Sequence, residues 1–334
     1  MALFARSLII ATILERKKLT LDEFITRLKN DSSTADVFEF FDEKIAKLSN
    51  AGQAGNASIY TSARNALRKF AKEKKLAFAD INYRYLMNFE NYLRIGGARD
   101  GGISNYMRTV RALFNEAIRR GIADQASYPF STQFNKNGYS IAKLKIAINP
   151  RAMTVEELTL IKNFNYPTYA ELAWAFQIFM FSFYEFGINF ADIARLTWAN
   201  IQGEHLRYVR KKTKKEYNIP PHPEARKIIK YFKGKDLLFP ILLPCHKTEE
   251  QKLEQVTNKR KAFNDAMREI GKILGIKTNL TSYVARHTSA TTLKRNGVSE
   301  DVISEALGHS DVVTTKRYLA HFENEVLKKA SERL

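Results

Sequence analysis

Residues 280–318 read LTSYVARHTSATTLKRNGVSEDVISEALGHSDVVTTKRY, and this stretch decides the fold. It holds Arg286, His309 and Tyr318 in that order, each beside an expected helix boundary. Gly308 is of a residue type that often ends a helix, so it lets His309 leave the helix before it. Tyr318 follows nine residues after His309, across a short turn.

These residue types supply what is needed to cut a phosphodiester bond without a metal ion. A tyrosine hydroxyl can serve as a covalent nucleophile. An arginine donates paired hydrogen bonds to phosphate oxygens and brings positive charge. A histidine or a lysine can give the leaving oxygen its proton. The stretch therefore predicts chemistry at the phosphate of a nucleic-acid strand.

The composition points the same way. The chain has 54 Lys and Arg residues against 35 Asp and Glu, a formal net charge of +19. Cations placed on phosphates release counterions, so this balance favours nucleic acid, although ribosomal-type and membrane-surface proteins share it. The single cysteine, Cys245, excludes a disulfide framework and a cysteine-rich metal site and fits a reducing cytoplasm. No apolar stretch approaches the roughly 20 residues that span a membrane.

Length and turn-rich segments predict the domain organisation. With 334 residues the chain exceeds what one compact core usually holds. Loop-forming residues gather at 49–56 and again over 128–147. We therefore expect a helical N-terminal segment over 1–50, a helical domain over 51–140 and a second domain over 150–334.

Helical periodicity dominates both domains, and one hairpin interrupts it. Strands are expected over His205–Lys211 and Glu216–Pro220, joined by a turn over 212–215. A buried helix is expected over 170–186, and another helix over Asn258–Leu274. The expected fold class is mainly α with a small β-sheet in the C-terminal domain.

A basic helix is expected over Asn105–Arg120, after a break at Gly101-Gly102. Its arginines are Arg108, Arg111, Arg119 and Arg120. Such a row can be a solvated basic face, but its density favours a helix that faces DNA.

The C-terminal motifs resemble the signature of the tyrosine recombinase, or phage integrase, family. Arg286-His287-Thr288 is followed by Leu307-Gly308-His309 and then by Tyr318, an order and spacing similar to those of that family. Residues 183–196, FYEFGINFADIARL, are similar to its first sequence box. Arg210-Lys211-Lys212-Thr213 resembles the hairpin that bears its catalytic lysine.

The resemblance extends to the first domain and covers roughly residues 57–325. The helix over 105–120, with Tyr128-Pro129-Phe130 after it, is similar to the family's core-binding domain. Residues 1–50 resemble the helical connector that follows an arm-binding domain in related integrases. The family implies a helical core-binding domain and a catalytic domain that clamp a DNA duplex.

The resemblance implies a role for each motif residue. Tyr318 would attack the scissile phosphate and form a 3′-phosphotyrosyl bond, and Arg286 would stabilise the charge that develops there. Lys212 would donate a proton to the 5′ oxygen, and His309 would hydrogen-bond the phosphate. Because the covalent bond conserves the phosphodiester energy, no metal, cofactor or ATP is implied. Lys214, in the same lysine-rich turn as Lys212, is expected to contact DNA.

The family further implies partners and a location. The enzyme would act on double-stranded DNA as a homo-tetramer joined through the C-terminal tail, here about 322–333, with no membrane partner. The apolar stripe of that tail could equally pack within its own chain. Accessory DNA-bending proteins are possible partners, and the location implied is the bacterial cytoplasm, at the nucleoid.

Two positions depart from the family pattern. Asn189 stands where the first box has an arginine, and Tyr283 stands three residues before Arg286 where a histidine is usual. A neutral amide brings no charge, so transition-state stabilisation needs another cation. Arg210 is the candidate, because it lies two residues before Lys212 and a strand's period of two would place both on one face. The sequence resembles the branch from Bacteroides-type mobile elements in both departures.

Two alternatives to a site-specific recombinase remain open. A relaxing enzyme like a type IB topoisomerase uses the same nucleophile chemistry. A DNA-binding accessory protein that has lost catalysis is the third hypothesis, and Asn189 is the feature that favours it. Formation of a covalent protein–DNA adduct separates the accessory protein from both enzymes.

Overall fold

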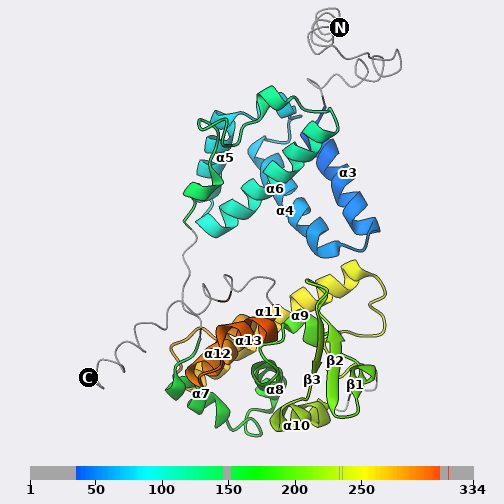
Figure 1. Ribbon diagram of the computed structural model, residues 1–334, viewed down its shortest axis with the longest axis vertical. Helices are drawn as coiled ribbons and strands as arrows, with labels where there is room; N and C mark the ends of the chain where they lie inside the picture. The colour runs from blue at the N-terminus through cyan, green and yellow to red at the C-terminus, as the bar shows by residue number, and fades with distance from the viewer. Residues whose placement is uncertain (1–34, 146–151, 233, 235, 309–314, 316–334) are drawn as a thin grey trace, which may run out of the picture. The chain divides into compact units, whose positions relative to one another are not determined.

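The computed structural model describes residues 35–145, 152–232, 234, 236–308 and 315. These residues form two compact units that divide between Ala147 and Ile148 (Figure 1). The described part is mainly helical and has one small antiparallel sheet, in the second unit, which confirms the expected fold class. No helix within it is long and apolar enough to cross a membrane.

The first unit is built from helices around one aromatic core. They are α3 (Val37–Asn50), α4 (Ala54–Phe70), α5 (Tyr83–Ile95) and α6 (Asp100–Arg119), with 3-10 turns at Phe78–Asp80, Gln125–Ser127 and Ile141–Lys143. Phe78 lies at the centre of this core, edge-on to Phe40 of α3 at 5.6 Å and to Phe114 of α6 at 5.2 Å.

The position of α3 corrects the domain boundary that the sequence suggested at residue 50. Val37, Phe38 and Phe41 are buried in the same cluster as the apolar residues of α4 to α6. Burying these side chains against α4 and α6 removes their apolar surface from water. If residues 1–50 formed a separate segment, that surface would stay exposed. Residues 37–50 therefore pack as part of the domain predicted over 51–140, while residues 1–34 lie outside the described part.

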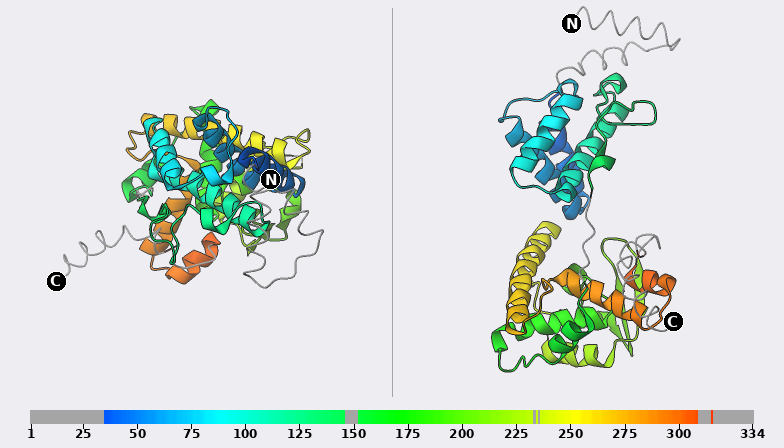
Figure 2. Two further views of the ribbon diagram at one scale, coloured as in Figure 1. Left: turned by 90° about the horizontal axis from the view of Figure 1, so that it is seen from above. Right: turned by 90° about the vertical axis from the view of Figure 1, so that its left-hand side faces the viewer.

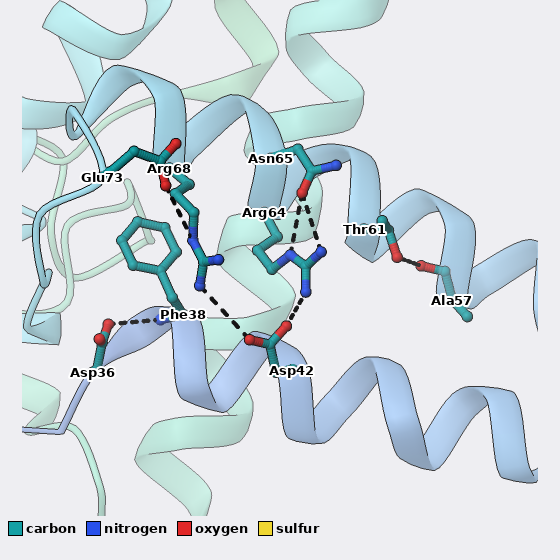
Figure 3. A network of polar contacts seen from close by, with 9 residues as sticks. All are labelled: Asp36, Phe38, Asp42, Ala57, Thr61, Arg64, Asn65, Arg68 and Glu73. Carbon is teal, nitrogen blue, oxygen red and sulfur yellow. Dashed lines mark hydrogen bonds and ion pairs between the residues drawn. The ribbon is translucent and has the colours of Figure 1, made fainter.

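Polar contacts also join α3 to α4, as Figure 3 shows. Asp42 of α3 forms an ion pair with Arg64 of α4 and lies 3.7 Å from Arg68, one turn further on. The Arg68 guanidinium also lies over the ring of Phe38, 5.0 Å from its centroid. Asp36 accepts a hydrogen bond from the Phe38 amide at 2.9 Å and so caps α3. Arg64 and Arg68 therefore bind side chains of their own unit.

Helix α6 begins at Asp100, five residues before the predicted start, so Gly101-Gly102 does not break the chain. Asp100 in the first turn pairs with Arg94 at 2.8 Å and accepts from the Lys145 amide at 2.8 Å. A carboxylate in the first turn suits the helix dipole, and these contacts fix the helix start despite the two glycines. The apolar face of α6 packs into the core and leaves the opposite face to polar residues.

The second unit surrounds an apolar central helix. Its helices are α7 (Val155–Lys162), α8 (Ala170–Tyr184), α9 (Phe190–Ile193), α10 (Pro223–Phe232), α11 (Glu249–Ile273), α12 (Ser282–Arg295) and α13 (Glu300–Leu307), with a 3-10 turn at Trp198–Asn200. Helix α8 is buried along most of its length, as the apolar stretch 170–186 predicted, and α10, α11 and α12 pack against it. Figure 1 shows α8 near the middle of this unit, and Figure 2 shows the same chain from two other sides.

Helix α11 begins nine residues before the predicted Asn258. Thr248 accepts from the Gln251 amide at 3.2 Å, and the Gln251 side chain accepts from the Thr248 amide at 3.1 Å. This reciprocal capping box stabilises a start at Glu249. The first turns of α11 bury little apolar surface. The helical repeat of apolar residues therefore begins only later in the helix, and the first buried residue is Val256.

The sheet is a meander of β1 (Ile201–Gln202), β2 (His205–Val209) and β3 (Glu216–Ile219). Tyr208 pairs with Tyr217 and Leu206 pairs with Ile219 across β2 and β3. Strand β2 ends at Val209, two residues earlier than predicted, because the chain turns at Arg210, and β3 ends at Ile219, one residue earlier than predicted.

Two backbone hydrogen bonds close that turn. The Arg210 amide donates to the Lys215 carbonyl at 2.8 Å, and the Lys214 amide donates to the Arg210 carbonyl at 2.8 Å. Lys214 has a φ of 58°, in the left-handed region. Arg210 and Lys212 are thus turn residues, and the strand alternation used to place them on one face does not apply.

Candidate active site

Arg286 is a buried cation at the centre of the second unit. It lies on α12 with 4% of its surface exposed. Its Nη1 donates to the Gly187 carbonyl at 2.8 Å, and its Nη2 donates to the Leu307 carbonyl at the end of α13. Arg286 therefore joins three parts of the chain: the loop after α8, helix α12 and the end of α13.

Gly187 makes this approach possible. Its φ is 70°, and a Cβ at this position would lie 2.6 Å from both Cα and Cγ of Arg286. Phe186 before it also has a positive φ, of 51°. A side chain at residue 187 would both strain the backbone and push α12 away, so the first box and Arg286 fit together through this glycine.

Arg210 is a second buried cation beside the same carbonyl groups. Its Nη1 donates to the Leu307 and Gly308 carbonyls, each at 3.1 Å. Asp192 of α9 holds it from the other side, with Oδ2 3.7 Å from Arg210 Nε, and also accepts from the Lys211 amide at 3.2 Å. The guanidinium groups of Arg210 and Arg286 therefore share Leu307 as an acceptor.

Asn189 lies directly against Arg210. With its side-chain oxygen turned toward the hairpin, Asn189 accepts from Arg210 Nη2 at 2.8 Å and from Nε at 3.3 Å. The amide at the first-box position thus binds the guanidinium that comes from the hairpin. Arg195, six residues further, donates to the Ala191 carbonyl and pairs with Glu249.

The lysines of the hairpin turn differ in their surroundings. Lys211 forms an ion pair with Glu249. Burial lowers the pKa of Lys211, and the nearby cations Arg195, Lys214 and Lys252 lower it further. Lys215 donates from Nζ to the Glu305 carbonyl at 2.8 Å.

Lys212 and Lys214 remain exposed, and within the described residues neither forms an ion pair. Of the two lysines directly after Arg210, Lys212 is therefore the one that can reach outward to a ligand. The sequence alone does not show which of Lys211 and Lys212 is paired. In the structure it is Lys211, with Glu249.

Gly308 ends α13 as predicted. It has a φ of 63° and forms the left-handed C-cap of the helix. The next residue, His309, and the predicted nucleophile, Tyr318, lie outside the described residues, as does the predicted docking segment 322–333. The described part thus includes the position from which His309 departs, and the roles of His309 and Tyr318 stay predictions.

Tyr283 lies in the first turn of α12, three residues before Arg286, and is 41% exposed. Its ring meets the ring of His287 edge-on, with centroids 4.9 Å apart. His287 is buried. Tyr283 is thus a partly exposed phenol one turn from Arg286.

The three predicted arginines of α6, Arg108, Arg111 and Arg119, and its C-cap, Arg120, are all exposed but not equivalent. Arg120 pairs with Glu43 at 3.0 Å, and its guanidinium lies 4.6 Å from the centroid of Phe40. Hydrogen bonds from Lys47 and then from Arg120 lower the pKa of Glu43. Arg120 is therefore engaged within the unit, which weakens the prediction that it binds DNA. Arg108, Arg111 and Arg119 form no ion pair within the described part.

Sequence reasoning missed Gly187 and Glu249 as parts of the site. Gly187 belongs to the first-box motif over 183–196. Its contact with Arg286 of α12 shows why a glycine is needed there, and that contact is not visible in the sequence. Glu249 is the first residue of α11, and the capping-box residues on either side of it, Thr248 and Gln251, are the sequence signal for that helix start. Among the described residues, no three carboxylate, imidazole or thiol side chains gather closely enough to hold a metal ion.

Comparison with known proteins accounts for both units. Residues 36–137 match the phage integrase SAM-like domain, and residues 153–325 match the phage integrase family. Tyrosine recombinase XerC of Rickettsia typhi is 24% identical over 181 residues, which cover 52% of this chain and 57% of XerC. Tyrosine recombinase XerD of Lacticaseibacillus casei is 43% identical over 54 residues, 16% of this chain and 18% of XerD. The matched regions thus span less than two thirds of these relatives.

Solved structures have the same fold. A lambda integrase tetramer bound to a Holliday junction has a TM-score of 0.62 at 17% identity, covering 92% of this chain and 83% of that one. The Tn1549 transposon integrase in complex with a circular intermediate DNA has a TM-score of 0.60 at 14% identity, covering 90% and 99%. Because the phage integrase family model matches more than half of the chain, and the site joins its first box, hairpin and arginine motif, the protein belongs to the phage integrase family of tyrosine recombinases.

Proposed function

We propose that this protein is a site-specific DNA recombinase that cleaves and rejoins strands through a 3′-phosphotyrosyl intermediate. The observation that carries the proposal is the meeting of Arg286 and Arg210 at the Leu307 carbonyl, one residue before the Gly308-His309 step. Two buried guanidinium groups at one place form a site for a doubly charged phosphorane. The proposed reaction is integration, excision or inversion.

In the proposed reaction, the Tyr318 oxygen loses its proton to His309 or to solvent and attacks the scissile phosphorus as the bond to the 5′ oxygen breaks. Lys212 gives that oxygen a proton, so a 5′ hydroxyl leaves. Arg286 and Arg210 stabilise the phosphorane, and His309 hydrogen-bonds it and assists proton transfer. Attack by a 5′ hydroxyl from another strand reverses the step and releases Tyr318, so the reaction is balanced without an external energy source.

Arg210 takes the place of the first-box arginine in this proposal. Asn189 has no charge, but it accepts from the Arg210 guanidinium at 2.8 Å and so holds a cation at the first-box position. Asp192 orients that cation from α9. Tyr283 supplies a hydrogen bond to the phosphate where related enzymes have a histidine. These substitutions fit the branch from Bacteroides-type mobile elements.

We further propose how the protein meets DNA. Arg108, Arg111 and Arg119 on α6 and Lys214 in the hairpin turn contact the phosphates of a duplex, with Arg120 as a weaker contributor. A homo-tetramer, joined through residues 322–333, would act on bacterial DNA in the cytoplasm, at the nucleoid, with accessory DNA-bending proteins. A lambda integrase tetramer on a Holliday junction is the relative that motivates this assembly.

The test uses duplex DNA from the sequence that flanks the gene, nicked near the crossover so that a cleaved strand cannot religate. Wild type should form a protein–DNA adduct that survives denaturant, and Tyr318→Phe should bind the same DNA without forming it. Binding without an adduct in wild type would favour the catalytically silent accessory protein. Relaxation of supercoiled DNA without strand exchange would favour the topoisomerase-like alternative.

A further inference from the structure

The hydroxyl group of Tyr217 lies where the hairpin, Arg210 and the end of α13 meet. Tyr217 is on β3, opposite Tyr208 of β2, and both rings face the buried side of the sheet. The two rings stack with centroids 4.7 Å apart and an interplanar angle of 2°. Such a stack fixes the direction in which each hydroxyl points.

Gly308 shows how closely this hydroxyl group approaches α13. A Cβ on Gly308 would overlap the Tyr217 hydroxyl oxygen and would lie 3.4 Å from Arg210 Nη1. The same Arg210 Nη1 donates to the Gly308 carbonyl at 3.1 Å. The Tyr217 oxygen, the Arg210 guanidinium and the Gly308 backbone are therefore packed together.

The electrostatics of this contact favour a neutral phenol. Burial raises the pKa of Tyr217, while Arg210 and Arg286 lower it, and the rise is the net result. The Tyr217 hydroxyl and the Arg210 guanidinium lie on the same side of Gly308, since both border the place where a Gly308 Cβ would stand. Lys215 lies over the ring, 5.8 Å from its centroid. A neutral hydroxyl oxygen that faces a guanidinium is an acceptor, so it restrains the cation without neutralising its charge.

We propose that Tyr217 is a positioning residue for the reaction: it holds the Arg210 guanidinium in place against the Gly308 turn. The inference rests on the proposed function and deepens it. Arg210 stands at the start of the hairpin turn, and its guanidinium is held by contacts from several parts of the chain. Asp192 restrains Nε, the Leu307 and Gly308 carbonyls restrain Nη1, and Tyr217 adds a rigid aromatic acceptor.

The variant that tests this is Tyr217→Phe, with Tyr208→Phe as its matched control. Both substitutions remove one hydroxyl from a buried, stacked ring, but it is the Tyr217 hydroxyl that borders the Gly308 Cβ position beside Arg210. With the nicked DNA, we expect Tyr217→Phe to lower the single-turnover rate of adduct formation about tenfold, the size of effect expected for one lost hydrogen bond. Tyr208→Phe should stay within about twofold of wild type.

Combination with Arg210→Gln separates positioning from a structural effect. If Tyr217 acts through Arg210, Tyr217→Phe should cause no further loss of rate in the Arg210→Gln protein. A tenfold loss that persists in that background, or a wild-type rate for Tyr217→Phe alone, would overturn the proposal. DNA affinity and melting temperature should be alike for the two phenylalanine variants.

A readout without catalysis keeps this result separate from the proposed function. The Nε–H resonance of Arg210, assigned by its loss in Arg210→Lys, can be followed in the full-length protein without DNA. We expect it to shift or broaden in Tyr217→Phe and to stay unchanged in Tyr208→Phe. An unchanged Arg210 resonance in Tyr217→Phe overturns the positioning role, whereas an absent adduct in wild type overturns only the proposed function.

Discussion

Gly187 and Arg286 fit together through both backbone and side chain. The Gly187 carbonyl accepts from Arg286 Nη1 at 2.8 Å, and a Cβ on Gly187 would lie 2.6 Å from the Arg286 Cα. The glycine therefore sets both the distance between α12 and the loop after α8 and the direction of the guanidinium. A substitution at residue 187 should act on stability and catalysis together.

Gly187→Ala should destabilise the protein by about 3 kcal/mol, because left-handed strain and overpacking add. It should also lower adduct formation at least 100-fold, since Arg286 moves with α12. Gly203→Ala is the matched control, because Gly203 has a φ of 60° but has open space around its Cβ position. Denaturant unfolding should give a cost of about 1 kcal/mol for Gly203→Ala, with adduct formation retained. Equal effects of the two variants would refute the close-approach argument.

Asn189→Arg should lower activity even though it restores the residue typical of the family. The new guanidinium would meet Arg210, whose Nη2 lies 2.8 Å from the Asn189 oxygen, and two like charges at this distance repel. The rate of adduct formation should fall about tenfold or more. Adding Arg210→Gln to Asn189→Arg should recover part of the rate. A faster Asn189→Arg single variant would show that Arg210 does not occupy the first-box place.

Lys212→Ala should slow cleavage because the 5′ oxygen loses its proton donor. A DNA substrate with sulfur in place of that 5′ oxygen should restore the rate, since a thiolate leaves without a proton. Lys211→Ala is the control, because Lys211 is paired with Glu249. Any slowing it causes should not be rescued by the sulfur substrate. Rescue of Lys211→Ala instead of Lys212→Ala would reverse the assignment.

Glu185 should make folding stability depend on pH near neutrality. It is 1% exposed, its Oε2 is unpaired within the described residues, and burial raises its pKa to about 7. The folded state then binds a proton that the unfolded state has lost, so the Glu185 contribution falls as pH rises from about 4.5 to 7. In denaturant titrations, Glu185→Gln should lack this fall, a difference on the order of 3 kcal/mol between pH 4 and pH 8.

Glu157 provides the opposite case. Burial alone would raise its pKa, but hydrogen bonds from Thr278, Thr154 and Lys277 outweigh it and lower the pKa. Its carboxylate accepts from the Thr278 hydroxyl at 2.7 Å and from the Lys277 and Thr278 amides at 3.0 Å. This contribution is present above the unfolded pKa of about 4.5 and is lost as pH falls through the lower folded value. Glu157→Gln should flatten the acid side of the stability curve and leave the neutral range unchanged.

The sequence predicted the motifs of the site better than their contacts. Arg286, Gly308 and the lysine hairpin are readable because their spacing is local. The contact between Gly187 and Arg286 is not readable, since it joins residues 99 positions apart. Strand alternation does not explain the position of Arg210, because the turn begins at this residue. Its place beside Asn189 comes from tertiary contacts with α9 and α13.

Element boundaries failed where capping and local polar contacts outweighed composition. Gly101-Gly102 predicts a break, yet Asp100 and its contacts start α6 before it. Helix α11 starts at a capping box rather than at the first apolar repeat. The boundary at residue 50 failed because a glycine-rich loop can join two helices of one core as well as two domains.

The central claim, that Tyr318 carries the DNA, is tested most directly by mapping the adduct. Wild-type protein trapped on nicked DNA would be digested with nuclease and trypsin, and the modified peptide sequenced by mass spectrometry. The account predicts a nucleotide on the fragment that spans residues 318–328, in which Tyr318 is the single tyrosine. A nucleotide on any of the other 14 tyrosines, or an adduct that survives in Tyr318→Phe, would contradict it.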